Sequence, residues 1–214
     1  MRGKKRKCLC PLILGLAFLL FLSGCTEQID IQNYLDTEVV RVNQSSLSMQ
    51  DMMFYVMRGE EQLLSMAKAY DSEKTTRFFN TRVNGKYMRT WAKEQALEHA
   101  ISDELYSQKA RKLGLTLSKD RRVQVEETAQ DLFFEMTEEQ RETTHLTEKA
   151  LSSLMEKMAY AEAYRSYMET IYGISLEEME IDGDFYLDVK NTAEVEVNEE
   201  FWRAVRFGKI TGTG

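Results

Sequence analysis

Residues 104–118 read ELYSQKARKLGLTLS, and they contain the end of one predicted helix and the start of the next. Gly114 can take the left-handed conformation that commonly closes a helix at its C-terminus. A little further on, Leu117 and Ser118 provide the apolar staple residue and the N-cap that typically open a helix. The stretch therefore predicts a turn between two consecutive helices, which favours a helical fold.

Apolar residues recur at helical spacing on both sides of this turn. We expect one helix over about residues 87–113 and another from Ser118, with residues 137–144 forming a break or a loosely continued helix. The first helix can bury Trp91, Leu97, Ile101, Leu105 and Leu113. The second can bury Val123, Ala129, Leu132, Phe133 and Met136.

Two further helices are predicted, one before this pair and one after it. Ser48 can cap the earlier helix, with Asp51 completing a capping box. The later helix begins at Leu146-Thr147 and ends at Gly173. Its apolar stripe consists of Leu151, Leu154, Met155, Met158, Ala161, Met168 and Ile171. Amphipathic helices cannot bury such stripes alone, so the four must pack on each other or on a partner.

Short strand patterns flank the helical region. Residues 39–42 alternate as a strand does, and residues 193–197 alternate in the same way. The sequence Ile181-Asp182-Gly183-Asp184 is typical of a hairpin turn leading into residues 185–189, and Asn198 can cap a short final helix. We expect these C-terminal strands to pair with residues 39–42. The predicted fold is mainly α, a four-helix domain with a small β element formed by strands from both ends.

The N-terminus has the layout of a secretory signal. A basic head precedes an apolar core over residues 12–22, and Leu22-Ser23-Gly24-Cys25 follows as a lipobox. This arrangement resembles a bacterial lipoprotein precursor, in which Cys25 would be diacylated and would carry palmitate-type lipid. The alternatives are a simple N-terminal membrane anchor and a buried helix, and the anchor is disfavoured because about eleven apolar residues are too few to cross a bilayer.

These patterns divide the chain into four segments. We expect a signal peptide at 1–24, a lipid-anchored polar tether at 25–38, a helical domain at 39–175, and a C-terminal hairpin with a short helix at 176–214. The expected location is the extracytoplasmic face of the cell membrane. Removal of the signal, which carries five positive charges, would change the net charge from −7 to −12. Such an acidic chain is not expected to bind nucleic acid.

Cysteine use leaves the exported part without a disulfide. Cys8 and Cys10 lie in the predicted signal, and Cys25 would be occupied by lipid. The domain is therefore expected to fold by packing alone.

Residues 104–118 also carry a resemblance to the SurA and PrsA family of exported chaperones. In that family a long helix ends in alanine-x-x-x-glycine, followed by an apolar-x-apolar-serine or -threonine that caps the next helix, as Ala110 to Ser118 do here. The order of predicted elements over residues 39–171 is similar too, with a weaker likeness over 195–202. The resemblance implies a helical SurA-N-like module that contacts unfolded or exported polypeptides.

The chain departs from full-length family members in one respect. Those proteins continue into a parvulin isomerase domain, which would begin close to residue 214 of this sequence. The two histidines, His99 and His145, fall in or beside the helical region. Isomerase activity is therefore not expected.

The remaining chemistry-bearing residues do not form a recognisable catalytic motif. The sequence contains no metalloprotease, phosphate-loop or nucleophile-elbow pattern. Acidic pairs such as Glu138-Glu139 lie near predicted helix starts, where they complement the helix dipole. We predict no enzyme activity, cofactor, metal site or small-molecule substrate.

Methionine and tyrosine residues are the candidates for client contact. Met52, Met53 and Met155 fall on the core stripes, whereas the candidate contacts Met49, Met57 and Met66 lie off them. Flexible thioether side chains suit a surface that fits many partners. Tyr160, Tyr164 and Tyr167 share one helix face. They either line a groove for an extended peptide or pack against a neighbouring helix with their hydroxyls at the edge.

The sequence as a whole predicts a lipid-anchored extracytoplasmic protein that binds nonnative or exported polypeptides without catalysis. An accessory lipoprotein with one dedicated protein partner is the alternative. An exposed apolar surface of a few hundred square ångströms is the physical requirement for the first.

Overall fold

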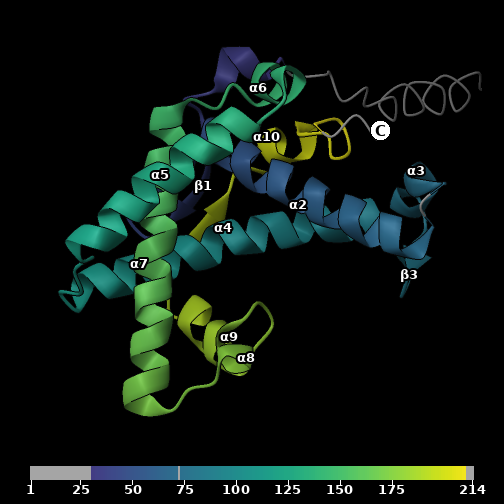
Figure 1. The fold of residues 1–214 in the computed structure, drawn as a ribbon. Coiled ribbons are helices and arrows are strands. Elements are labelled where there is room, and N and C mark those ends of the chain that lie inside the picture. The colour runs from purple at the N-terminus through teal and green to yellow at the C-terminus, as the bar shows by residue number, and fades with distance from the viewer. Residues whose placement is uncertain (1–29, 72, 211–214) are drawn as a thin grey trace, which may run out of the picture.

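The computed structural model describes residues 30–71 and 73–210 and shows a mainly helical protein with two small sheets (Figure 1). The predicted signal, Cys25 and the first part of the predicted tether lie outside the described residues. Within the described ranges, no helix combines the length and the apolar character needed to cross a membrane.

In chain order, the helices and strands of the described residues fall into one set that ends at residue 112 and a second that begins at residue 119. The first set is η2 (Ile31–Tyr34), β1 (Glu38–Val42), β2 (Ser45–Ser48), α2 (Met49–Tyr70), α3 (Thr75–Phe79), β3 (Arg82–Val83), β4 (Lys86–Tyr87) and α4 (Met88–Lys112). The second is α5 (Lys119–Glu135), α6 (Glu138–Thr144), α7 (Glu148–Tyr172), α8 (Leu176–Met179), α9 (Asp184–Asn191), β5 (Val195–Val197) and α10 (Glu199–Ala204).

Helix α4 is the centre of the fold. Helix α2 packs along it, and α7 crosses it at a steep angle (Figure 1). Helix α5 packs on α7, and the short helices α8 and α9 lie near the C-terminal half of α7, with α9 also contacting α4. The core therefore forms where α2, α4 and α7 meet.

The predicted helix starts and stops are confirmed. Ser48 accepts a hydrogen bond from the Asp51 backbone N–H at 3.2 Å, and the Asp51 carboxylate accepts one from the Ser48 N–H at 2.8 Å. The Ser118 and Thr147 hydroxyls cap α5 and α7 by accepting hydrogen bonds from the backbone N–H groups of Arg121 and Ala150, both at 3.1 Å. Gly114 closes α4 with a φ of 72°. Local capping chemistry thus fixed these boundaries.

The pairing of the two ends of the chain is also confirmed. Strand β1 pairs antiparallel with β5, with Val40 opposite Val197, and forms the centre of a β2-β1-β5 sheet. Strand β2, which the sequence patterns did not predict, continues from β1 through a turn at Asn43 and leads directly into the Ser48 cap.

The predicted hairpin over residues 181–189 is wrong. Asp184–Asn191 forms helix α9, which buries Tyr186 and Val189, three residues apart on one helical face. The short apolar run fits both strand and helix periods, and packing against α4 selects the helix. Gly183 is required because a side chain there would collide with the carbonyl oxygens of Glu177 and Glu178.

Three positions assigned to buried faces are exposed instead. Leu113, Val123 and Ile171 lie near helix ends or on the outer side of α5, and each is about half exposed. The polar stretch 137–144 contains a separate short helix, α6, with its own capping box between Thr137 and Gln140. The helical period of the apolar residues does not predict how much of each stripe is covered by neighbouring elements.

The C-terminal segment is held on α2 and α4 by two charged side chains that bind backbone groups. The buried Glu60 carboxylate accepts hydrogen bonds from the N–H groups of Gly208 at 2.6 Å, Lys209 at 3.1 Å and Ile210 at 2.9 Å. The ammonium of Lys93 donates to the carbonyls of Trp202 and Val205, both at 2.6 Å. These contacts fix the path of residues 202–210.

Candidate functional site

Two neighbouring hollows open where α2, α4, α5 and α7 meet. The first, about 330 Å³, lies between α2 and α4, and the second, about 280 Å³, lies between α4, α5 and α7. Asp103 and Met158 line both, so we treat the pair as one central groove. The residues that line the groove include Phe54, Tyr55, Trp91, His99, Asp103, Val125, Met158 and Arg165.

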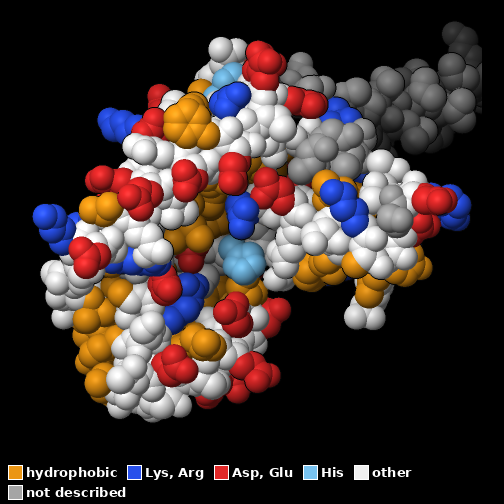
Figure 2. Space-filling view, in the orientation of Figure 1, with side chains coloured by type: hydrophobic (Ala, Val, Ile, Leu, Met, Phe, Trp, Pro, Cys, Tyr) orange, Lys and Arg blue, Asp and Glu red, His pale blue; other side chains and the backbone are white. Residues whose placement is uncertain are grey.

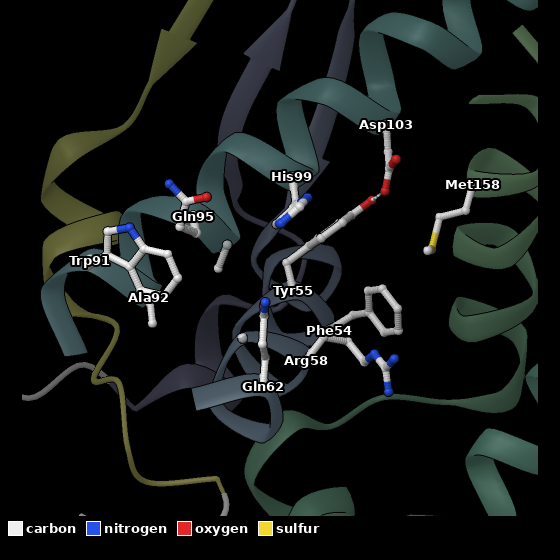
Figure 3. A pocket seen from close by; sticks show the side chains of 12 residues that line it. Phe54, Tyr55, Arg58, Gln62, Trp91, Ala92, Gln95, His99, Asp103 and Met158 are labelled. Atoms are coloured by element: carbon white, nitrogen blue, oxygen red, sulfur yellow. Dashed lines mark hydrogen bonds between the residues drawn. The ribbon is translucent and has the colours of Figure 1, made fainter. Parts of the chain in front are cut away.

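The floor of the groove is apolar and its borders are charged. Phe54 and Tyr55 are buried, while Trp91 and Met158 are half-buried and present part of their surface to the hollow. Figure 2 shows hydrophobic side chains recessed between charged ones on this face. In Figure 3, Trp91 and Met158 lie at opposite sides of the hollow, with Tyr55 and His99 between them. This pattern suits a ligand with both apolar and polar groups, such as a polypeptide.

A buried ion pair crosses the middle of the groove. Arg165 of α7 approaches Asp103 of α4 at 3.3 Å and also donates to the Ser102 hydroxyl at 3.2 Å. The Tyr55 hydroxyl donates to the other Asp103 oxygen at 3.3 Å (Figure 3). Both carboxylate oxygens of Asp103 are therefore occupied by partners within the fold.

The pKa values of these groups reflect their burial. Burial raises the pKa of Asp103 above its usual value, and the nearby Arg165 opposes that shift. Burial likewise raises the pKa of Tyr55 well above its usual value, and the adjacent Asp103 adds to the effect. Desolvation by neighbouring side chains lowers the pKa of His99, which is exposed at the border of the groove. The network joins α2, α4 and α7.

Among residues 30–71 and 73–210, no group of three or more acidic, histidine or cysteine side chains is placed to hold a metal ion. The predicted lipidation site, Cys25, lies outside these residues.

The structure places two of the three candidate methionines inside the core. Met49 and Met57 have no exposed surface, so the expectation that they lie outside the core is wrong. The residues Met52 to Met57 are all buried, because α2 is covered on several sides where it passes between β2, α4 and α7. Met66 is 37% exposed and does not line the central groove; it lies one helical turn beyond Gln62, the last residue of α2 that does.

The tyrosine row packs against neighbouring groups. Tyr160 and Tyr164 are buried, with the Arg111 guanidinium 4.0 Å from the Tyr160 ring centre and the Tyr106 ring 5.4 Å from Tyr164. Tyr167 is half-buried and makes an edge contact with Tyr172. Of the two interpretations of this row, packing is the one that describes Tyr160 and Tyr164, and neither lines the central groove.

The groove itself was not found from the sequence, because its residues come from four helices that are far apart in the chain. One signal was present: Ser102-Asp103-Glu104 places three polar residues within the buried face of α4. Buried carboxylates require partners, and here these are Arg165 for Asp103 and Lys157, at 2.8 Å, for Glu104. These polar residues at core positions of α4 therefore lie where α4 crosses α7.

A comparison with protein families identifies the fold. A sequence model of the SurA-like N-terminal domain matches residues 1–140, which include β1, β2 and helices α2 to α5. The chain belongs to the SurA-like N-terminal domain family. No curated protein and no solved structure matches the chain. The SurA-like domain is of a chaperone-related, non-catalytic type. In this member of the family, α7 lies beyond the matched residues and contributes one side of the central groove.

Proposed function

We propose that this protein is a lipid-anchored extracytoplasmic chaperone that binds nonnative polypeptides in the central groove without catalysis. The single observation that carries the proposal is an open, apolar-floored groove with charged borders in a SurA-like domain. In this proposal the client contacts the central groove and not the methionine and tyrosine surfaces that the sequence suggested.

The size and chemistry of the groove favour short unfolded segments over folded partners. Each hollow has room for a few side chains, and Trp91 and Met158 offer adaptable apolar contacts to them. A client segment would be released when burial inside its own fold becomes more favourable than burial in the groove. Such binding requires no covalent step.

The proposed location rests on the N-terminal sequence. The basic head, the apolar core and the Leu22 to Cys25 lipobox support export and lipidation at Cys25. We expect the wild-type protein to incorporate radiolabelled palmitate and to sediment with membranes. A Cys25→Ala variant is expected to lose the label, and labelling that persists in this variant would contradict the assignment.

Aggregation assays with several unrelated unfolded substrates test the chaperone proposal. A Trp91→Ser/Met158→Ser variant removes two half-buried apolar side chains from the groove and is expected to protect these substrates several-fold less well. The matched control is Met66→Ser/Tyr70→Ser, which removes two exposed apolar side chains outside the groove. Circular dichroism and thermal unfolding establish that both variants are folded.

The pattern of protection separates the two function classes. Protection of many substrates, lost in the groove variant and kept in the control, supports a general chaperone. Protection of none, together with capture of one partner, would favour a dedicated accessory lipoprotein instead.

A further inference from the structure

A larger hollow, separate from the central groove, lies between α3, the start of α4 and the segment after α10. It encloses about 830 Å³ and is lined by Phe79, Asn80, Val205 and Phe207 among others. None of its lining residues belongs to the central groove. The hollow therefore is a second potential binding site.

The lining of this hollow is strongly basic. Among the described residues it contains five basic side chains, and none of its lining residues is acidic: the basic ones are Arg89, Lys93, Arg203, Arg206 and Lys209. The whole chain has the opposite balance, with 35 acidic and 28 basic residues. This local excess of positive charge is not explained by composition.

Three of the five cations have no protein partner in the described part of the chain. Arg203 pairs with Glu199 at 3.3 Å, and the Lys93 ammonium binds the carbonyls of Trp202 and Val205. The side chains of Arg89, Arg206 and Lys209 form no ion pair or hydrogen bond within residues 30–71 and 73–210. Within the described residues, three positive charges without an ion-pair partner thus surround one hollow, and a bound anion would relieve the repulsion between them.

The backbone that carries two of these cations is rigidly held. Val205 and Phe207 are buried, whereas Arg206 and Lys209 project outward from the same segment. The Glu60 carboxylate accepts hydrogen bonds from the backbone N–H groups of Gly208 and Lys209. The backbone that carries both cations is thus set before any ligand arrives, so that only their exposed side chains are ordered on binding.

We infer that this hollow binds a phosphate-bearing ligand through Arg89, Arg206 and Lys209. A phosphate monoester can neutralise more of this charge than a single carboxylate, and guanidinium groups match its oxygens in two-point contacts. The volume of the hollow exceeds what inorganic phosphate needs and leaves room for an attached organic part. A soluble phosphate ester and an anionic lipid headgroup share this chemistry.

The fluorescence of Trp202, which contacts a residue that lines the hollow, is the readout of ligand binding. The Trp202 ring lies 4.8 Å from the Lys93 ammonium, which lines the hollow, and the only other tryptophan, Trp91, can be replaced by Phe. The full chain carrying Trp91→Phe is titrated in detergent with inorganic phosphate and with glycerol 3-phosphate, with ionic strength held constant by sodium chloride. In a second arm it is reconstituted in phosphatidylcholine vesicles with and without phosphatidylglycerol.

An Arg89→Gln/Arg206→Gln variant tests which residues are responsible. It is expected to bind at least about tenfold more weakly, because charge-assisted hydrogen bonds from both guanidinium groups are lost. The matched control is Lys112→Gln/Lys119→Gln, which removes two exposed positive charges at the C-terminus of α4 and the start of α5. All four side chains are exposed, so the fold should be unaffected.

Each outcome decides the inference. A saturable response to the soluble phosphates, weakened in the arginine variant alone, supports a site for a soluble ester. A response that requires phosphatidylglycerol, with the same dependence on the arginines, supports a lipid headgroup. The inference is overturned by no response in either arm, by the same response to chloride, or by equal weakening in the control. Client protection is measured separately, so its failure leaves this result intact.

Discussion

The two walls of the central groove are built differently. The α4 wall is the centre of the core: every residue from Ile101 to Ser107 is buried. The α5 wall packs mainly on α7 and buries only Val125 and Ala129 within its own length. One wall of the groove is thus fixed by surrounding structure, while the other rests on a single neighbour.

The ion pairs on the two walls show the same contrast. Arg165 and Asp103 join α7 to α4 with side chains only 21% and 10% exposed. Arg121 and Glu162 join α5 to α7 with side chains 35% and 63% exposed. Water screens the second pair more strongly than the first, so the two should differ in their effect on stability. The α4–α7 side of the groove is thus held more firmly than the α5 side.

The largest effect is expected on the α4 wall from Tyr106→Ala. The Tyr106 ring is fully buried, contacts Tyr164 and Tyr186, and its hydroxyl donates to the Met179 carbonyl at 2.9 Å. Its removal should lower the free energy of unfolding by about 4 kcal/mol in urea titrations. Tyr106→Phe, which removes the hydroxyl alone, should cost about 1 kcal/mol. A loss of less than about 1 kcal/mol for Tyr106→Ala would contradict the firm packing proposed for the α4 wall.

A somewhat smaller, pH-dependent loss is expected from Arg165→Met. Burial already raises the pKa of Asp103, and without Arg165 that pKa should rise further. The folded state then holds the Asp103 proton more tightly than the unfolded state does. The variant should therefore lose about 3 kcal/mol near neutral pH, and progressively less as the pH falls through the raised pKa towards the usual aspartate range.

A double variant provides the control for this prediction. Asp103→Asn/Arg165→Met removes both charges, so most of the loss near neutral pH should be recovered. A pH-independent loss in the single variant would show that packing of Arg165 on the Tyr106 ring, 4.8 Å away, matters more than the ion pair.

On the α5 wall, Val125→Ala should have a smaller and more local effect. Val125 is 7% exposed, and truncation should cost about 1 kcal/mol. Hydrogen exchange should speed up in α5 while the α4 amides keep their protection, because α5 depends mainly on α7. Equal loss of protection in both helices would contradict the proposed difference between the walls.

The smallest effect is expected from Arg121→Gln, which breaks the exposed pair with Glu162. The free energy of unfolding should change by no more than about 0.5 kcal/mol. Differential scanning calorimetry at low and high salt measures this directly. A loss as large as that of Arg165→Met would show that exposure does not distinguish the two pairs.

Local sequence was sufficient wherever a boundary depended on one side chain and its immediate backbone. Ser48, Ser118 and Thr147 open helices where the sequence predicted them, and Gly114 and Gly173 end helices. The same local reasoning failed for residues 184–191, whose apolar run fits two periods equally well. There the choice depends on contact with α4, a helix some eighty residues away.

The sequence by itself determined where most helices begin and end and that the two chain ends form a sheet, because caps, turns and alternation act over a few residues. Tertiary structure decided which parts of each apolar stripe are covered. Met49 and Met57 lie in the core, whereas Leu113 and Val123 are exposed. Asp103 pairs with Arg165 where α4 and α7 cross. The groove and the basic hollow exist only where distant segments meet, and the angle at which helices cross depends on the packing of many side chains at once.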